Sequence, residues 1–221
     1  MSNERDEIAA TLERMVQASR NRGYATWFHA PSDLKRYVEV DTVAEWAAVV
    51  NPRYSWDIRE IRKNESPYPD CLADWGPRTA RQPALVGIEV TELVEQDAID
   101  ARREVRCLTQ EKVAALSDEK LRALHGRCEP DWPLEKFRDR LAAIIEAKDR
   151  RARDASLDRQ FLLICTDEPW LNDSTVARYL PAITLSRPRT FDGVFLMLSY
   201  TPRGGNEGDY PVFEVPLAKS S

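Results

Sequence analysis

The most regular run of apolar positions in the chain extends from Ala84 to Glu92. Valine, isoleucine and leucine fill most of it, and this composition favours strands, so we predict a buried strand over these residues. Side chains of a strand alternate between its two faces, which places Glu89 and Thr91 on one face and Val90 on the other. A carboxylate therefore lies in the middle of an apolar strand, where it needs a cation or a strong polar partner.

Weaker periodicities along the rest of the chain predict an alternation of helices and strands. We expect helices over residues 4–21, 42–50, 134–153 and 174–180, and strands over residues 54–59, 70–75, 161–165, 194–200 and 212–215. Asp41 is expected to cap the second helix and Pro52 to end it. This order predicts an α/β fold with an early antiparallel meander and a later crossover.

Residues 95–133 differ in composition from the chain around them. They are highly charged, and we expect them to be helical in two pieces, broken by Gly126, Pro130 and Pro133. We interpret them as a helical insertion into a single domain that spans residues 1–216. The remaining residues, 217–221, are expected to form a flexible tail.

Composition and charge exclude several classes of protein. None of the apolar runs in the 221 residues approaches the roughly 20 needed to span a bilayer, so no membrane contact is expected. The charged N-terminus lacks the features of a signal peptide, which predicts a cytoplasmic protein.

The four cysteines have no zinc-clip spacing and are expected as free thiols, with Cys71 and Cys165 in the core. Only His29 and His125 are present, which excludes a histidine-rich metal site. The net charge of −5 argues against coating nucleic acid by bulk electrostatics, but it permits a local basic groove.

A second carboxylate, Asp70, lies at the start of the strand that precedes the one bearing Glu89. If these two strands pair across the polar loop of residues 76–83, their carboxylates converge on one point. Two carboxylates, a backbone carbonyl and water suit a hard cation such as Mg²⁺ or Mn²⁺. An alternative stays open, in which Glu89 pairs with an arginine and Asp70 caps a turn.

These segments resemble the core of the PD-(D/E)XK, or restriction-endonuclease-like, nuclease superfamily. Ser66-Pro-Tyr-Pro-Asp70, a hairpin and then Gly87-Ile-Glu-Val-Thr-Glu-Leu93 are similar to the variant branch whose third motif reads Ile-Glu-Val-Thr-Glu. The resemblance covers residues 56–93 best and implies a core of helix, three-strand meander, helix and strand. It also implies a metal-dependent nuclease. Asp70, Glu89 and the Val90 carbonyl would then hold the metal ion, and an activated water would attack a phosphodiester bond of DNA or RNA.

One position departs from the pattern of that superfamily, which has a lysine two residues after the acidic residue. Thr91 stands there and carries no positive charge, although its hydroxyl can donate a hydrogen bond. Lys148 is the replacement that we expect, because it continues the apolar stripe of the helix over residues 134–153. Lys148 could instead mark the end of that helix and extend into solvent. If no lysine takes over, the chain is a catalytically inactive binding or scaffold protein on the same fold.

Basic residues near the two carboxylates are candidates for contacts with nucleic acid. Arg78 and Arg81 lie in the hairpin loop and Arg151 lies in the basic run of residues 149–153, which is also typical of a solvated helix end. Glu13 is a further candidate acid from the first helix, although a solvated helix surface is the usual explanation for such a residue. We therefore expect nucleic acid as the partner. The sequence leaves the oligomeric state open, a homodimer included.

Overall fold

The computed structural model describes residues 32–77, 82–95, 97–98, 100–101, 104, 107–128, 132–151, 154–168, 171–198 and 210–219, and only the backbone of residues 32–38, 110–111 and 128. Its contacts divide the chain into two compact units. We call residues 31–93 and 132–221 the sheet unit. We call residues 94–131, which group with residues 1–30, the insertion unit. The predicted helix over residues 4–21 lies outside the described residues.

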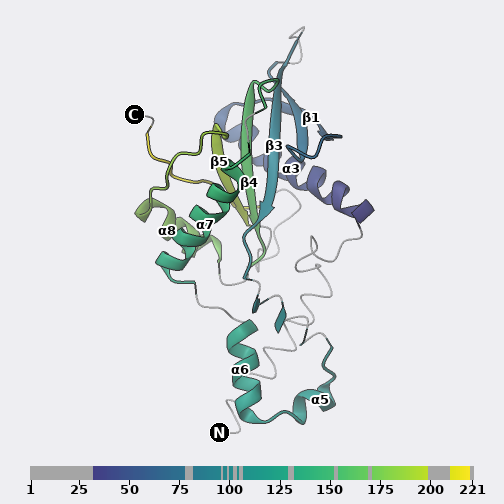
Figure 1. Cartoon of the computed structure of the whole chain (residues 1–221), viewed down its shortest axis with the longest axis vertical. Helices are drawn as coiled ribbons and strands as arrows, with labels where there is room; N and C mark the ends of the chain where they lie inside the picture. Colours follow the sequence, from purple (N-terminus) through teal and green to yellow (C-terminus); the bar gives the residue numbers. More distant parts are fainter. Residues whose placement is uncertain are drawn as a thin grey trace. The chain divides into compact units, whose positions relative to one another are not determined.

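The described strands of the sheet unit form a single mixed sheet (Figure 1). They are β1 (Ile58–Lys63), β2 (Cys71–Trp75), β3 (Ala84–Glu92), β4 (Arg159–Thr166), β5 (Gly193–Leu198) and β6 (Val212–Glu214). They lie in the order of the sequence, with β1, β2 and β3 as an antiparallel meander, β3, β4 and β5 parallel, and β6 antiparallel. The expected α/β class is confirmed, and β3 begins and ends at the predicted residues.

Helix α3 (Ser32–Tyr54) packs on one face of this sheet and is longer than predicted. Its buried apolar side chains recur at positions i, i+3, i+4 and i+7, namely Val43, Trp46, Ala47 and Val50. Glu39 continues the stripe one turn earlier and is also buried, so Asp41 is an exposed interior residue rather than a cap. The prediction started the helix too late because a charged residue occupies a buried position of its stripe.

The end of α3 corrects the predicted strand over residues 54–59. Pro52 lies inside the helix instead of ending it, and Tyr54 is the last helical residue. The side-chain amide of Asn51 accepts a hydrogen bond from the Ile58 N–H and donates one to the Ile58 carbonyl, each at 2.9 Å. This pair of hydrogen bonds fixes the chain directly after the helix, so the strand begins at Ile58. The contacts of the folded protein therefore outweigh the helix hydrogen bond that Pro52 cannot make.

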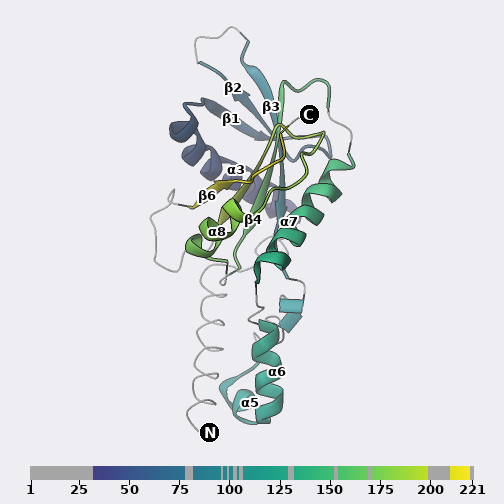
Figure 2. The ribbon, with the colours of Figure 1, turned by 90° about the vertical axis from the view of Figure 1, so that its left-hand side faces the viewer.

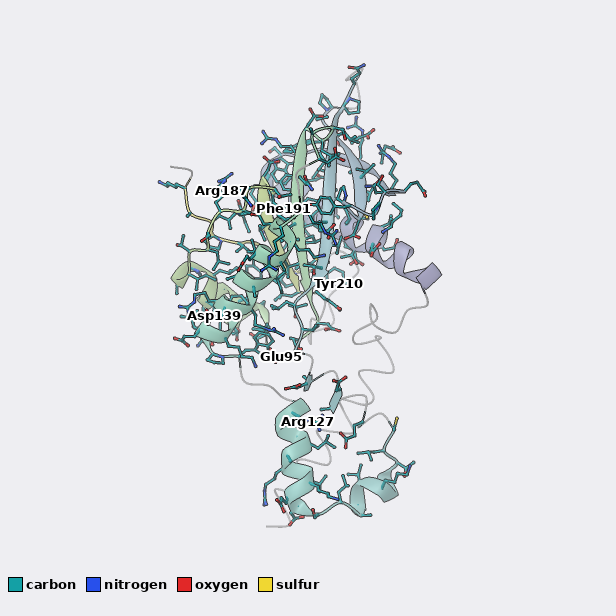
Figure 3. All side chains as sticks on the ribbon, in the orientation of Figure 1. Glu95, Arg127, Asp139, Arg187, Phe191 and Tyr210 are labelled. Carbon is teal, nitrogen blue, oxygen red and sulfur yellow. The ribbon has the colours of Figure 1, made fainter. Side chains whose placement is uncertain are left out.

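Helices α7 (Leu134–Asp149) and α8 (Asp173–Tyr179) belong to the core on the face opposite α3, and Figure 2 shows α3 and α7 on the two sides of the strands. Their apolar residues pack against alternate residues of β4 and β5. The core includes Phe137, Leu141, Ile145, Leu162, Ile164, Val176, Val194 and Leu196. Phe191 is buried in the same layer, whereas Asp139 lies on the exposed side of α7 (Figure 3). The sheet is therefore covered by helices on both faces, as its parallel centre requires.

Two chain segments differ from their predicted ends. Helix α7 ends at Asp149 rather than at residue 153, because the Asp149 carboxylate accepts a hydrogen bond from the Thr190 N–H at 2.7 Å. This bond ties the end of the helix to a distant loop. In the stretch expected as a loose tail, Leu217 forms a parallel bridge with Leu185.

The insertion unit contains α5 (Gln110–Ala114) and α6 (Asp118–Cys128). Among its described residues, Ala101, Leu121 and Leu124 form a buried apolar cluster with a few partly buried side chains around them, and Ala98 is also buried. Gly126 lies inside α6 and does not break it. A glycine in a helix costs only about 1 kcal/mol relative to alanine, so packing elsewhere on the helix can offset it.

The predicted burial of Cys71 and Cys165 is confirmed. Cys71 and Cys165 are buried free thiols, and Cys107 is an exposed one. Burial raises the pKa of Cys71 to about 12 and that of Cys165 well above its usual value, so both thiols stay protonated at neutral pH. Among the described helices, none is long and apolar enough to cross a membrane.

Candidate active site

Glu89 lies on the face of β3 that is covered by α7. It aligns with Leu162 of β4, whose side chain belongs to the core beneath that helix. Only 1% of the Glu89 side chain is exposed. A carboxylate in such a place is costly unless cations and hydrogen bonds compensate for the lost water. The contacts around Glu89 therefore determine how much of the cost of burying this carboxylate is compensated.

Two cations approach the same oxygen of Glu89. Lys148 Nζ lies 2.7 Å from Glu89 Oε1, and Arg151 Nη1 lies 3.4 Å from it. The second oxygen, Oε2, is buried and has no hydrogen-bond partner within the described part of the chain. Glu89 thus has one oxygen that is fully engaged and one that is still able to accept a ligand.

Lys148 reaches Glu89 because of its place on α7. Phe137, Leu141 and Ile145 form the buried stripe of this helix, and Lys148 follows three residues after the last of them. Its side chain is 24% exposed, so most of its length is covered while its ammonium group faces the strand. Of the two interpretations of Lys148 that the sequence left open, the one in which it reaches Glu89 describes the contact in the structure. Its role in catalysis stays a prediction.

Burial raises the pKa of Glu89, and the nearby Asp70 carboxylate raises it further. Lys148 and Arg151 act in the opposite direction, because each favours the charged form of the carboxylate. The net effect is a raised pKa, so Lys148 and Arg151 do not fully compensate for the loss of water and the second carboxylate. A further cation beside Glu89 would relieve this imbalance.

Asp70 is held directly before β2 by the turn that precedes it. The Asn64 N–H donates to the Asp70 carbonyl at 3.0 Å, and the Asn64 side chain donates to the Pro69 carbonyl at 2.8 Å. The Asp70 carboxylate accepts a hydrogen bond from the Val90 N–H at 2.9 Å through Oδ2. Asp70 is therefore tied to the strand that carries Glu89, one residue beyond it.

The main chain at Val90 faces the edge of β3 next to which β2 has ended. Cys71, the first residue of β2, pairs with Ile88, so no residue of β2 lies opposite Val90. In a strand, the N–H and C=O of one residue point to the same side. Since the Val90 N–H bonds to Asp70, the Val90 carbonyl also points toward Asp70. This places the three predicted metal ligands, Asp70, Glu89 and the Val90 carbonyl, around one end of β3.

Lys63 and Glu39 extend the site and were not singled out from the sequence. Lys63 Nζ lies 3.8 Å from Asp70 Oδ1 and donates a hydrogen bond to Glu39. Burial alone would lower the pKa of Lys63 and is the largest single effect. The hydrogen bond to Glu39, the charge of Glu39 and the charge of Asp70 together outweigh it, so the pKa of Lys63 is raised. Glu39 lies at a buried position of the α3 stripe, but its charge makes it look like a surface residue in the sequence.

The structure describes some of the remaining predicted site residues but not all of them. Thr91 is half-buried, aligns with Ile164 and lies on the same face of β3 as Glu89. Arg151 is part of the site through its contact with Glu89. Arg78 and Arg81, predicted to contact phosphates, and Glu13 lie outside the described residues. Whether any of these residues contacts nucleic acid stays a prediction.

The donor set fits a hydrated Mg²⁺ or Mn²⁺ better than a metal held by protein ligands alone. Among the described residues, no group of three or more histidine, cysteine, aspartate and glutamate side chains converges as a metal cage. Mg²⁺ is commonly held by one or two carboxylates and retains several waters. The unpartnered Oε2 of Glu89 and the neighbouring Asp70 are the two carboxylates that could hold such an ion.

No family model matches this chain, and no curated protein or solved structure is significantly similar to it. A fold class alone does not determine an activity. Function is therefore inferred from the charged groups around Glu89 and from the elements that hold them.

Proposed function

We propose that this protein is a metal-dependent nuclease that hydrolyses phosphodiester bonds of DNA or RNA. One observation carries the proposal: the ammonium group of Lys148 lies 2.7 Å from Glu89, a buried carboxylate whose other oxygen is unpartnered and whose neighbour is Asp70. Structural ion pairs also shift pKa values, but they rarely leave a buried acceptor unused beside a second carboxylate.

The arrangement of elements supports the same proposal. Helix α3, the meander of β1, β2 and β3, helix α7 and strand β4 follow one another in the order that the restriction-endonuclease-like resemblance implies. The helical insertion lies between β3 and α7. Asp70 directly precedes β2, Glu89 lies in the adjacent strand β3, and Lys148 comes from the helix that covers Glu89.

In the proposed mechanism, each residue has a separate task. Asp70, Glu89 and the Val90 carbonyl would hold Mg²⁺ or Mn²⁺, which when bound activates water and neutralises charge that develops on the phosphate. Lys148 supplies the cation that the third motif lacks at Thr91, and it orients Glu89 through their hydrogen bond. The core around α7 holds Lys148 in place beside the buried Glu89.

A catalytically inactive binding protein is the second candidate, and the same contacts motivate it. Lys148 already engages Oε1 of Glu89, and the Val90 N–H already engages one oxygen of Asp70. If these bonds are permanent, the two carboxylates are structural partners and bind no metal. This candidate predicts that Mn²⁺ does not raise the melting temperature of the protein.

The proposal is tested by incubating the purified protein with single- and double-stranded DNA and with RNA, in Mg²⁺ and in Mn²⁺. Cleavage should be lost in Glu89→Gln and in Lys148→Met. Two matched controls on α7 should cut as the wild type does: Glu146→Gln, at a glutamate that is 74% exposed, and Lys136→Met, at a lysine that lies over Trp132.

Absence of cleavage with every substrate and both ions would overturn the nuclease proposal. Separately, a melting temperature that rises with Mn²⁺ in the wild type but not in Asp70→Ala would show that the two carboxylates bind a metal ion. That result would reject the candidate in which they are only structural partners. Cleavage that survives in Glu89→Gln would show that the activity belongs to another site or to a contaminant.

A further inference from the structure

Arg151 is the more exposed of the two cations at Glu89. Its side chain is 50% exposed, against 24% for Lys148, and its contact with Glu89 is long, at 3.4 Å against 2.7 Å. A long, solvent-exposed ion pair is weak, because water screens it and because the side chain loses freedom in forming it. Arg151 can therefore leave Glu89 at little cost, whereas Lys148 cannot.

The position of Arg151 does not depend on Glu89. The Thr190 hydroxyl donates a hydrogen bond to the Arg151 carbonyl at 2.8 Å, which fixes the backbone directly after α7. The guanidinium group also lies over the ring of Tyr68, with its carbon 5.0 Å from the ring centroid. Stacking on an aromatic ring leaves the N–H groups at the edge of the guanidinium plane free to bind a ligand.

Tyr68 brings a second donor to the same place. Its hydroxyl is buried and has no hydrogen-bond partner within the described part of the chain, which is uncommon for a tyrosine. Tyr68 precedes Pro69 and Asp70, whose positions are fixed by Asn64. Arg151 contacts both the Tyr68 ring and Glu89, so one guanidinium group joins an unused donor to the candidate active site.

We infer that Arg151 and Tyr68 form a phosphate-binding pair beside Glu89, in which the guanidinium group and the hydroxyl donate hydrogen bonds to one phosphate group. A planar guanidinium group matches the geometry of phosphate, and a tyrosine hydroxyl adds a neutral donor. The inference rests on the proposed function for the identity of the ligand. It deepens that function by naming the residues that hold the phosphate and by separating them from Lys148, which stays with Glu89.

Binding of a fluorescein-labelled DNA duplex tests the inference without requiring cleavage. The anisotropy of the label is measured with Ca²⁺, which takes oxygen ligands as Mg²⁺ does, and again with EDTA. Arg151→Gln should weaken binding about tenfold, and Tyr68→Phe, which keeps the ring, should weaken it several-fold. The controls are Arg178→Gln, at an arginine that also lies over a tyrosine ring, and Tyr179→Phe, at a hydroxyl that already bonds to the Trp132 carbonyl.

Salt dependence distinguishes a phosphate contact from a structural effect. The logarithm of the binding constant falls with the logarithm of salt concentration, with a slope of about 0.9 for each phosphate neutralised in a duplex. Arg151→Gln should reduce this slope by about one contact, whereas Tyr68→Phe and Arg178→Gln should leave it unchanged. Duplexes with and without a 5′-phosphate, and competition by inorganic phosphate, show whether the pair takes a terminal or a backbone phosphate.

An unchanged affinity and slope in Arg151→Gln would overturn the inference, as would a failure of the folded wild-type protein to bind any of these probes. The outcome is separable from that of the nuclease proposal. If Arg151→Gln loses binding but the wild type never cuts, the phosphate pair stands and the activity does not. If the wild type cuts and Arg151→Gln binds and cuts normally, the activity stands and the pair does not.

Discussion

Glu89 places a carboxyl group in the part of β3 where a charge is hardest to keep. Its side chain is 1% exposed and its pKa is raised, first by burial and then by Asp70. Lys148 supplies most of the compensation, since it makes the shorter of the two cationic contacts with Glu89. The same pair can therefore serve catalysis and stability, and the two contributions have to be measured separately.

Lys148→Met should lower the free energy of unfolding by about 3 kcal/mol. The substitution removes the shorter cationic contact of the buried Glu89 carboxylate and leaves it the longer, more exposed contact with Arg151. The double variant Glu89→Gln/Lys148→Met should recover most of that loss, since a neutral pair of similar size is then buried instead. Urea unfolding of the wild type, both single variants and the double variant measures the coupling. Additive losses would show that Lys148 does not stabilise Glu89.

The raised pKa of Glu89 makes a prediction for pH. Between the ordinary carboxyl value of 4.5 and the raised value in the folded state, the folded protein holds a proton that the unfolded chain has lost. Stability therefore falls as pH rises through this window. Glu89→Gln cannot ionise, so its free energy of unfolding relative to the wild type should increase as the pH rises above 4.5 in EDTA. A difference that is constant over this range would contradict the raised pKa.

At the scale of elements, the sequence predicted what depends on local pattern and missed what depends on tertiary contacts. The limits of β3 were predicted because a nearly continuous apolar run marks the strand in the sequence. The stripe of α7 was also visible, and it led to Lys148. The first turns of α3 were missed because buried Glu39 looks like a surface residue in the sequence. The contact between Arg151 and Tyr68 joins segments far apart in the chain, and no local pattern contains it.

Gly87 makes the close approach between β3 and the segment before Asp70 possible. A Cβ atom at this position would lie 2.7 Å from Pro69 Cγ and 2.6 Å from Leu157 Cδ1. The leucine can move, but Pro69 is rigid and is bonded directly to Asp70. Gly87→Ala should therefore cost about 2 kcal/mol of stability and should reduce any activity by displacing Asp70. Thermal unfolding and the cleavage assay measure the two effects.

Gly126 in α6 provides the matched control for that substitution. A Cβ atom there would meet nothing within 4 Å, and its backbone does not require a glycine. Gly126→Ala should stabilise the protein by up to about 1 kcal/mol, because alanine favours the helix. Equal effects of the two substitutions would show that the close contact at Gly87 relaxes without consequence.

At the scale of the whole molecule, the two units differ in what they bury. The sheet unit has apolar cores on both faces of its sheet, with large side chains such as Trp46 and Phe137 fully covered. Among the described residues of the insertion unit, the buried apolar side chains are Ala98, Ala101, Leu121 and Leu124. Hydrophobic stabilisation grows with the apolar area removed from water, so we expect β4, in the core of the sheet unit, to be held more firmly than α6, whose described side chains are mostly exposed. The described residues of the candidate site all belong to the sheet unit.

Hydrogen exchange of the intact chain should reveal this difference directly. Amides of β4 lie between β3 and β5 and under helices on both faces, so they should exchange only when the whole sheet unit unfolds. Amides of α6 should exchange at least about tenfold faster through local opening. Mass spectrometry of peptides from the two elements, at increasing urea below the unfolding transition, measures both rates. The β4 rate should rise steeply with urea and the α6 rate only slightly, because opening α6 exposes little surface. Equal rates with equal urea dependence would mean that the two units unfold together, and substitutions in α6 would then be expected to affect the candidate site.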